Sequence, residues 1–365
     1  MRDVLERLVQ WWEAGVPVGL ATVTATWSSA PRRPGAAMVV GPGGEVVGSV
    51  SGGCVEGAVY ELCQEVIETG TARTARFGVS DDDAFEVGLT CGGTIELLVE
   101  RVDRESFPQL GELARAVAEG RPVALLTRID DARHRLVTPE TSDGTLGSER
   151  IDDAVTDDGR GLLAAGRTGV LQYGPSGERR GEGLPVLVAS FAPPARMLVF
   201  GATDHAAATA RIGSFLGYHV TVCDARPVFA TARRFPSADE VVVDWPHRYL
   251  SAEVEAGRVD ERTVLCILTH DPKFDVPVLE VALRLPVAYV GAMGSRRTHD
   301  DRNKRLLEAG LTGGELARLA SPVGLDLGAR TPEETAVSIA AEIVALRWGG
   351  TGARLTATEG PIHSD

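Results

Sequence analysis

The sequence predicts an α/β protein with two domains, the second built on a doubly wound parallel sheet. Strand-like and helical stretches alternate regularly after Pro193-Pro194, a dipeptide that can continue neither a helix nor a central strand. A chain of 365 residues is also long enough to form two hydrophobic cores. We therefore expect domains at residues 1–192 and 195–350, followed by a flexible tail at 351–365.

Hydrophobic spacing predicts the elements of the first domain, which we expect to be α/β. The expected elements are a helix at 2–13, a strand at 16–27, a hairpin at 36–40 and 45–50, a helix from Val55, a strand at 94–102, a helix at 107–120 and a strand at 122–129. Residues 130–183 are rich in Gly, Asp, Arg and Ser, which predicts short strands and exposed loops, with Asp152-Asp153 in a solvated turn.

The second domain alternates short apolar runs with helical stretches, which is typical of a Rossmann-like sheet. The expected strands lie at 197–200, 219–223, 240–243, 263–269 and 287–290. The last helix has a clear start, because Thr331-Pro332-Glu333-Glu334 combines an N-cap, a proline at the first helical position and a capping glutamate.

Composition excludes several broad classes of function. The net charge of −14 argues against general binding of nucleic acid or of an anionic membrane. No stretch approaches the ~20 apolar residues of a membrane span, and the first residues do not resemble a signal peptide. Five cysteines, an odd number, fit free thiols in the reducing cytoplasm.

The most informative motifs are two cysteines that adjoin paired glycines, Gly52-Gly53-Cys54 and Cys91-Gly92-Gly93. Cys54 is expected just before a helix, where unpaired N–H groups and the helix dipole stabilise an anion and lower a thiol pKa to about 3.5–7.5. The alternative is a buried cysteine at a tight turn. Neither motif has the Cys-x-x-Cys spacing of a zinc site, and we expect the two thiols to share one pocket.

A third candidate is Arg32-Arg33, two adjacent cations on a proline-rich loop. Paired guanidiniums on a loop suit bidentate binding of phosphate or carboxylate. The alternative is a solvated surface pair.

The first turn of the second domain stands where a dinucleotide fingerprint belongs. Gly201 is in place, but Thr203 replaces the glycine that lets the backbone approach a pyrophosphate, and Asp204 would repel a phosphate. Asp224 ends the next strand, where an acid that binds ribose belongs. Thr203 and Asp204 therefore argue against NAD(P) binding by this domain, while Gly201 and Asp224 keep it as an alternative.

Further polar residues follow the expected strands, at the sheet edge where such folds bind ligands. Together with the first turn they form a candidate second pocket: Gly201, Asp224, Arg226, His270, Asp271, Gly294, Ser295 and Arg296. The alternatives are local, since His270-Asp271 can form a turn or a helix cap and Arg296 can be a surface charge.

These motifs together resemble the XdhC/CoxI family, the accessory proteins of xanthine dehydrogenase and related molybdenum hydroxylases. The resemblance covers most of the chain outside residues 103–190. It rests on residues 30–38, 51–56, 88–93, 224–226, 234–236, 269–271, 291–295, 322–328 and 331–333. One departure is Gly201-Ala202-Thr203-Asp204-His205, where family members usually carry Gly-Ala-Gly-His.

The resemblance implies an XdhC/CoxI-type N-terminal domain and a cofactor chaperone rather than an enzyme. Such a chaperone binds molybdenum cofactor, protects it while its sulfido ligand is installed, and delivers it to the apo-enzyme of a molybdenum hydroxylase. A sulfurtransferase (a cysteine desulfurase) would be a second partner. On this reading Arg32 and Arg33 hold the cofactor phosphate, while Cys54 or Cys91 approaches the molybdenum or relays sulfur.

Two other classes of function stay open. One is an NAD(P)-dependent oxidoreductase that uses His270 as general acid or base, which Thr203 argues against. The other is a scaffold that docks the hydroxylase and the sulfurtransferase without holding cofactor. A hinge at Pro193-Pro194 would also permit domain exchange, so we expect a homodimer.

Overall fold

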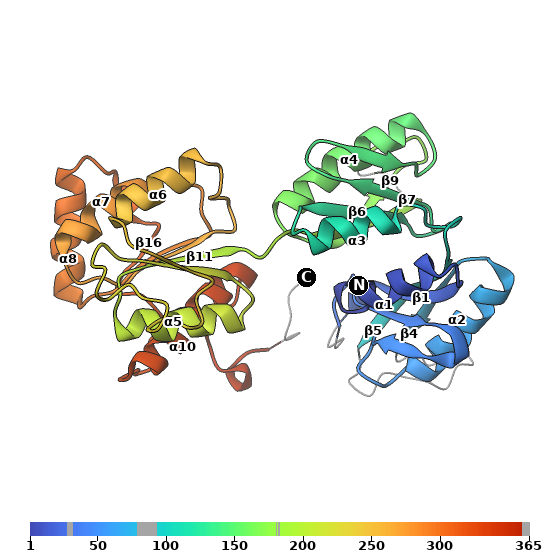
Figure 1. The fold of residues 1–365 in the computed structure, drawn as a ribbon, viewed down its shortest axis with the longest axis horizontal. Coiled ribbons are helices and arrows are strands. Elements are labelled where there is room, and N and C mark those ends of the chain that lie inside the picture. The colour runs from blue at the N-terminus through green and yellow to red at the C-terminus, as the bar shows by residue number, and fades with distance from the viewer. Residues whose placement is uncertain (28–31, 79–92, 180, 182, 360–365) are drawn as a thin grey trace. The chain divides into compact units, whose positions relative to one another are not determined.

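The computed structural model describes residues 1–27, 32–78, 93–179, 181 and 183–359. Its contacts divide the described chain into an N-terminal unit that ends at Pro193 and a C-terminal unit that begins at Pro194. Each unit is an α/β structure with its own cores (Figure 1). No helix among the described residues is long and apolar enough to cross a membrane.

Two five-stranded antiparallel sheets form the N-terminal unit. Sheet A has the order β3-β2-β1-β5-β4, and sheet B has the order β8-β7-β6-β10-β9. The strands of sheet A are β1 (Val18–Trp27), β2 (Ala37–Val40), β3 (Val46–Gly48), β4 (Arg73–Phe77) and β5 (Thr94–Val102). The strands of sheet B are β6 (Val123–Arg128), β7 (His134–Val137), β8 (Ser142–Gly144), β9 (Gly169–Tyr173) and β10 (Leu184–Phe191).

Helices cover both sheets of this unit because the strands bury alternate residues on opposite faces. The helices are α1 (Arg2–Glu13), α2 (Glu56–Thr69), α3 (Leu110–Ala118) and α4 (Glu149–Ala164). Helices α1 and α3 share one core with the inner faces of both sheets. Helix α2 covers the outer face of sheet A, and α4 covers the outer face of sheet B.

A buried polar link joins the inner faces of the two sheets. Nε2 of His134 on β7 lies 2.8 Å from Oε2 of Glu100 on β5, and both side chains are almost fully buried. The other ring nitrogen lies 3.2 Å from the hydroxyl of Thr127, and the imidazole stacks on Phe107 with the ring centroids 3.9 Å apart. These partners satisfy a polar pair that would otherwise destabilise the shared core.

One expectation for residues 130–183 was wrong. The segment contains the helix α4, with Ile151, Val155 and Leu163 buried against sheet B. Asp152 is not in a solvated turn, because it lies buried in the first turn of α4 and accepts a hydrogen bond from the Leu146 amide at 2.7 Å. Acidic residues in the first turn and a serine N-cap favour the helix, and its charged outer face made the segment resemble a loop.

The C-terminal unit is a parallel six-stranded sheet, sheet C, in the order β13-β12-β11-β14-β15-β16. Its strands are β11 (Arg196–Phe200), β12 (His219–Cys223), β13 (Glu240–Val242), β14 (Val264–Ile267), β15 (Tyr289–Ala292) and β16 (Leu319–Ala320). This is the strand order of a Rossmann fold, with the switch point between β11 and β14, and it confirms the predicted doubly wound sheet.

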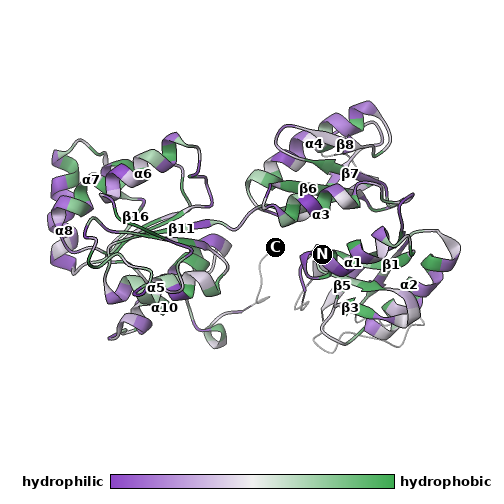
Figure 2. Cartoon of the chain, viewed as in Figure 1, coloured by the Kyte–Doolittle hydropathy of each residue, from purple (hydrophilic) through white to green (hydrophobic). Residues whose placement is uncertain are grey.

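Helices flank both faces of sheet C (Figure 1). They are α5 (Asp204–Phe215), α6 (Pro246–Glu255), α7 (Pro272–Ala282), α8 (Arg296–Glu308), the short α9 (Gly313–Leu316) and α10 (Pro332–Trp348). Helices α5 and α10 pack on one face, and α6, α7 and α8 pack on the other. Figure 2 shows the central strands as mostly hydrophobic, as expected for strands covered on both faces.

Candidate functional site

The turn between β3 and α2 carries the first predicted cysteine. Gly52 and Gly53 have φ angles of +81° and +117°, values that residues with a side chain rarely adopt. This backbone places Cys54 just before α2, half-buried against the core between α2 and sheet A. We call residues 49–56 the cysteine turn.

Glu56, which sequence reasoning did not single out, organises the cysteine turn. Its carboxylate accepts hydrogen bonds from the hydroxyls of Ser49 (2.6 Å) and Ser51 (2.5 Å) and from the amides of Ser51 (2.9 Å) and Gly53 (2.8 Å). The amides of Val50 and Val55 donate to it at 3.2 Å. Burial alone would raise the pKa of Glu56, but the hydrogen bonds outweigh burial and lower the pKa to about 2.

Two further amides of the turn donate to its serine hydroxyls. The Gly52 amide donates to Ser49 Oγ at 2.8 Å, and the Cys54 amide donates to Ser51 Oγ at 2.9 Å. The amides of residues 50–55, which lead into α2, therefore already donate to Glu56 and to two serine hydroxyls. The signal for this arrangement was a carboxylate in the first helical turn after paired glycines, next to two serines.

The second cysteine motif is only partly described. Cys91 and Gly92 lie outside the described residues, and Gly93 is buried just before β5. The expectation that Cys54 and Cys91 share a pocket thus stays a prediction.

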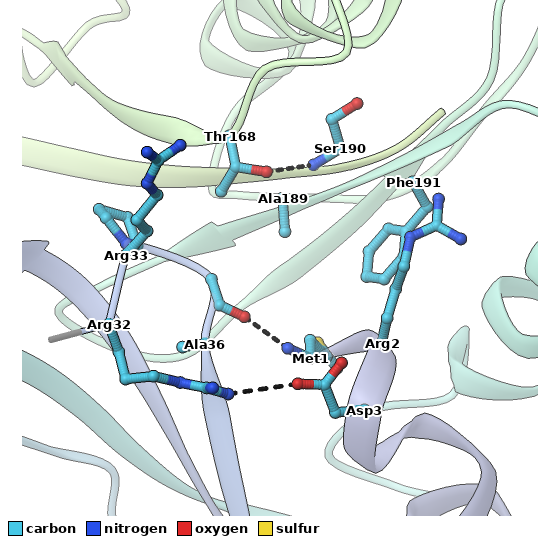
Figure 3. Close-up of a pocket in the computed structure, with 12 residues that line it drawn as sticks. Met1, Arg2, Asp3, Arg32, Arg33, Ala36, Thr168, Ala189, Ser190 and Phe191 are labelled. Atoms are coloured by element: carbon cyan, nitrogen blue, oxygen red, sulfur yellow. Dashed lines mark hydrogen bonds and ion pairs between the residues drawn. The ribbon is translucent and has the colours of Figure 1, made fainter. Parts of the chain in front are cut away.

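Arg32 and Arg33 line a cavity of about 430 Å³ in the N-terminal unit, which we call the arginine cavity. Its wall also includes Arg2 and Asp3 at the start of α1, Thr168 just before β9, and residues 189–191 of β10 (Figure 3). Gly35, with a φ of +87°, lets the loop approach Thr168, whose methyl group would lie 3.0 Å from an added Cβ. No residue of the cysteine turn lines this cavity, so the structure does not bring Cys54 and the arginine pair into it together.

The first turn of sheet C is filled by the chain's own side chains. Gly201 passes close to β14, since an added Cβ would lie 3.0 Å from the carbonyl group of Leu268. Asp224 is buried and accepts hydrogen bonds from the Ala202 amide at 2.7 Å and from Nε and Nη2 of Arg226 at 2.9 and 2.7 Å. The Thr203 hydroxyl accepts a hydrogen bond from the Ala206 amide and so caps α5.

This arrangement does not fit NAD(P). The Ala202 and Ala206 amides already donate hydrogen bonds to side chains of the domain itself. The carboxylate of Asp224, which would bind ribose, forms an ion pair with the Arg226 guanidinium. Asp204 adds a negative charge in the first turn of α5, where a pyrophosphate would need donors.

The other predicted residues of the second pocket have local roles or are exposed. Asp271 is the N-cap of α7 and forms an ion pair with Lys273 at 2.8 Å. Ser295 is the N-cap of α8, and Gly294 precedes it with a φ of +158°. His270 and Arg296 are exposed.

A buried ion pair that the sequence did not reveal joins three loops at the carboxyl edge of sheet C. Arg302 Nη2 lies 2.9 Å from Asp275 Oδ2, and both side chains are at most 5% exposed. Arg302 also donates to the Met293 carbonyl and to the Ser321 hydroxyl, and Thr269 donates to Asp275. Burial raises the pKa of Asp275, against the opposing effect of Thr269 and Arg302. The pair thus ties the loops after β14, β15 and β16 to α7 and α8.

No group of three or more His, Cys, Asp or Glu side chains that could hold a metal ion occurs among the described residues. Cys54, which we considered as a molybdenum contact, therefore belongs to no such group within that part of the chain.

Comparison with known proteins gives matches in both units. A family model described as the XdhC and CoxI family matches residues 11–78, and one described as the XdhC Rossmann domain matches residues 197–343. A probable xanthine dehydrogenase subunit of Bacillus subtilis (strain 168) is 27% identical over 346 residues, which are 94% of this chain and 96% of the relative. The molybdenum cofactor insertion chaperone PaoD of Escherichia coli (strain K12) is 28% identical over 346 residues, 95% of this chain and 88% of the relative.

A solved structure is also similar over nearly the whole chain. The crystal structure of a xanthine dehydrogenase from Bacillus halodurans superposes with a TM-score of 0.67 at 24% identity, covering 98% of both chains. At this identity the similarity concerns the fold alone.

Proposed function

We propose that this chain, which belongs to the XdhC and CoxI family, binds molybdenum cofactor as cargo and supports its insertion into a molybdenum hydroxylase. The cargo combines an anionic phosphate with a soft metal–dithiolene centre. The observation that carries the proposal is that the N-terminal unit of this acidic chain offers a cavity lined by three guanidiniums. Guanidiniums suit the phosphate through charge-assisted hydrogen bonds.

Two groups of residues have separate proposed roles. Arg32 and Arg33 hold the phosphate of the cargo. The sulfur of Cys54, or that of Cys91, contacts the molybdenum as a soft ligand. Glu56 supports this role because it fixes the backbone on both sides of Cys54.

The partners follow from the proposed cargo. The recipient is the apo-enzyme of a xanthine dehydrogenase or CO dehydrogenase type hydroxylase, and a cysteine desulfurase supplies sulfur for the sulfido ligand while the cofactor is bound. We further propose a homodimer that works in the cytoplasm. Light scattering after size-exclusion chromatography tests the dimer, and a monomeric mass at micromolar concentration would refute it.

Cargo binding is tested by measuring pterin on purified chain. The chain is co-expressed with cofactor synthesis, purified and oxidised in acid, which releases a fluorescent pterin product. We expect wild type to carry pterin and Cys54→Ser with Cys91→Ser to carry much less. Cys63→Ala is the matched control, because Cys63 is fully buried in the core between α2 and sheet A. Absence of pterin from wild type would refute the proposed function, and equal pterin in wild type and the double variant would exclude these thiols.

A further inference from the structure

We propose that the arginine cavity is a phosphate-binding site and that Arg2, at the start of α1, is one of its ligands. That the cavity binds a phosphate does not depend on the proposed function. That this phosphate belongs to the molybdenum cofactor rests on the proposed function. The lining side chains comprise the guanidiniums of Arg2, Arg32 and Arg33 and a single carboxylate, that of Asp3. The cavity is therefore locally cationic in a chain whose net charge is −14, and it favours an anion.

Arg2 has no carboxylate partner among the described residues. Its Nη2 atom donates to the Ala192 carbonyl at 2.7 Å, and its guanidinium lies over the Phe191 ring, 5.4 Å from the centroid. Neither partner carries a charge, and desolvation by the surrounding atoms lowers the pKa of Arg2. An anion in the cavity would compensate this charge and use the donors that Ala192 leaves available.

The carboxylate in the cavity does not prevent anion binding. Arg32 Nη2 lies 3.2 Å from Asp3 Oδ2, and the two side chains are 36% and 68% exposed. A single exposed ion pair of this kind contributes little free energy, so a phosphate that accepts hydrogen bonds from several guanidiniums would displace it. Asp3 then competes with the ligand for Arg32, so removing its charge should increase the affinity for phosphate.

The wall also offers a hydroxyl beside the guanidiniums. Thr168 lines the cavity, and its hydroxyl oxygen accepts a hydrogen bond from the Ser190 amide at 3.0 Å. The hydroxyl hydrogen of Thr168 stays available as a donor. Figure 3 shows Thr168 between Arg33 on one side and Arg2 with Phe191 on the other, whereas the Ser190 hydroxyl points away from Met1, Arg32 and Asp3. A hydroxyl with flanking guanidiniums is a suitable set of donors for phosphate oxygens.

The size of the cavity indicates more than a bare ion. A volume of about 430 Å³ lies within the range of small-molecule sites, about 300–1,000 Å³. The Phe191 ring and Pro34 offer apolar surface beside the cations. The ligand class is thus a small organic phosphate or diphosphate.

Pyrophosphate is the probe for the site itself. Isothermal titration at low ionic strength is expected to detect binding to the full wild-type chain, and Arg2→Gln and Arg33→Gln each to weaken it at least tenfold. Asp3→Asn should tighten binding. Arg115→Gln on the exposed face of α3 is the matched control and should change nothing. Circular dichroism of each variant checks folding. No binding by wild type, or equal weakening by Arg115→Gln, would overturn the site.

Retained pterin identifies the ligand. If Arg2→Gln and Arg33→Gln lose pterin after co-expression and Arg115→Gln keeps it, the phosphate is that of the cargo. If pyrophosphate binding is lost and pterin content is unchanged, the assignment to the cargo is overturned and the cavity binds a free phosphate compound. If wild type binds pyrophosphate and carries no pterin, the site stands and the proposed function fails.

Discussion

Glu56→Gln should loosen the cysteine turn without unfolding the sheet beneath it. In wild type, the amides of Gly53 and Val55 donate to one carboxylate oxygen of Glu56. In the variant, glutamine keeps one acceptor oxygen, but its NH2 group takes the place of that second oxygen and cannot accept these hydrogen bonds. Those amides lose a charged acceptor and gain a repulsive neighbour. The turn should therefore open more often, and Cys54 should become more mobile with it.

The magnitude follows from the pKa of Glu56. A lowering from the ordinary 4.5 to about 2 corresponds to at most about 3 kcal/mol of stabilisation by the ionised form. Glu56 is only partly buried, so solvent screening reduces this to about 1–2 kcal/mol. Because the pKa is lower in the folded chain, the stabilisation is complete above about pH 4.5 and is lost as pH falls toward 2.

Hydrogen exchange read by mass spectrometry measures this effect locally. At pH 7 the loss of about 1–2 kcal/mol should speed exchange in peptides that span residues 49–56 by about 5–30-fold. Glu61→Gln, an exposed position on the same helix, is the control and should leave exchange unchanged. Exchange in Glu56→Gln that equals wild type, or that is faster throughout sheet A, would refute the assignment of Glu56 to this turn.

Three further predictions concern the C-terminal unit and the core. Arg302→Met leaves Asp275 buried without its partner and should destabilise the unit by about 3–5 kcal/mol in calorimetric unfolding; adding Asp275→Leu should restore part of the loss. Thr331→Ala removes the capping box of α10 and should cost about 1 kcal/mol in the same assay. Burial raises the pKa of three thiols to about 12, so they should resist alkylation at pH 8 until the chain unfolds: Cys63, Cys223 and Cys266. Peptide mapping that finds any of them modified in folded chain would contradict this.

The elements that the sequence predicted well are those determined by local pattern. The strands of sheet C are covered on both faces, so they stand out as short apolar runs between helical stretches. The capping box of α10 is confirmed, because the Thr331 hydroxyl accepts from the Glu334 amide and the Glu334 carboxylate accepts from the Thr331 amide. Both signals lie within a few neighbouring residues, where spacing alone identifies them.

Helix α4 was not predicted because several of its residues are more typical of loops than of helices. Gly159 and Gly161 weaken helix propensity, and the acidic residues resemble a loop. Gly159 lies close to sheet B, since an added Cβ there would lie 3.1 Å from the Leu126 side chain, which would have to shift. Close contact between a helix and a sheet depends on the tertiary structure, and the sequence of residues 149–164 alone does not indicate that contact.

The arginine cavity was only half predictable for a similar reason. Arg32 and Arg33 are adjacent in the sequence and were read as an anion-binding pair. Arg2 and Ser190 join them only after α1 and β10 pack against the loop. Residues this far apart share no spacing that a single sequence can reveal.

The two glycine-containing turns support the proposal that guanidiniums, and not backbone amides, hold the cargo phosphate. In a glycine-rich turn before a helix, the amides are expected to bind an anion from a ligand. In this chain a side-chain carboxylate takes the place of the ligand's anion. Glu56 accepts hydrogen bonds from amides of the cysteine turn, and Asp224 accepts one from the Ala202 amide. In the proposed function, recognition of the cargo phosphate would therefore depend on guanidiniums rather than on backbone dipoles. Exposed guanidiniums are screened by salt, so phosphate affinity should fall steeply as ionic strength rises, whereas a site built on buried amides would respond weakly.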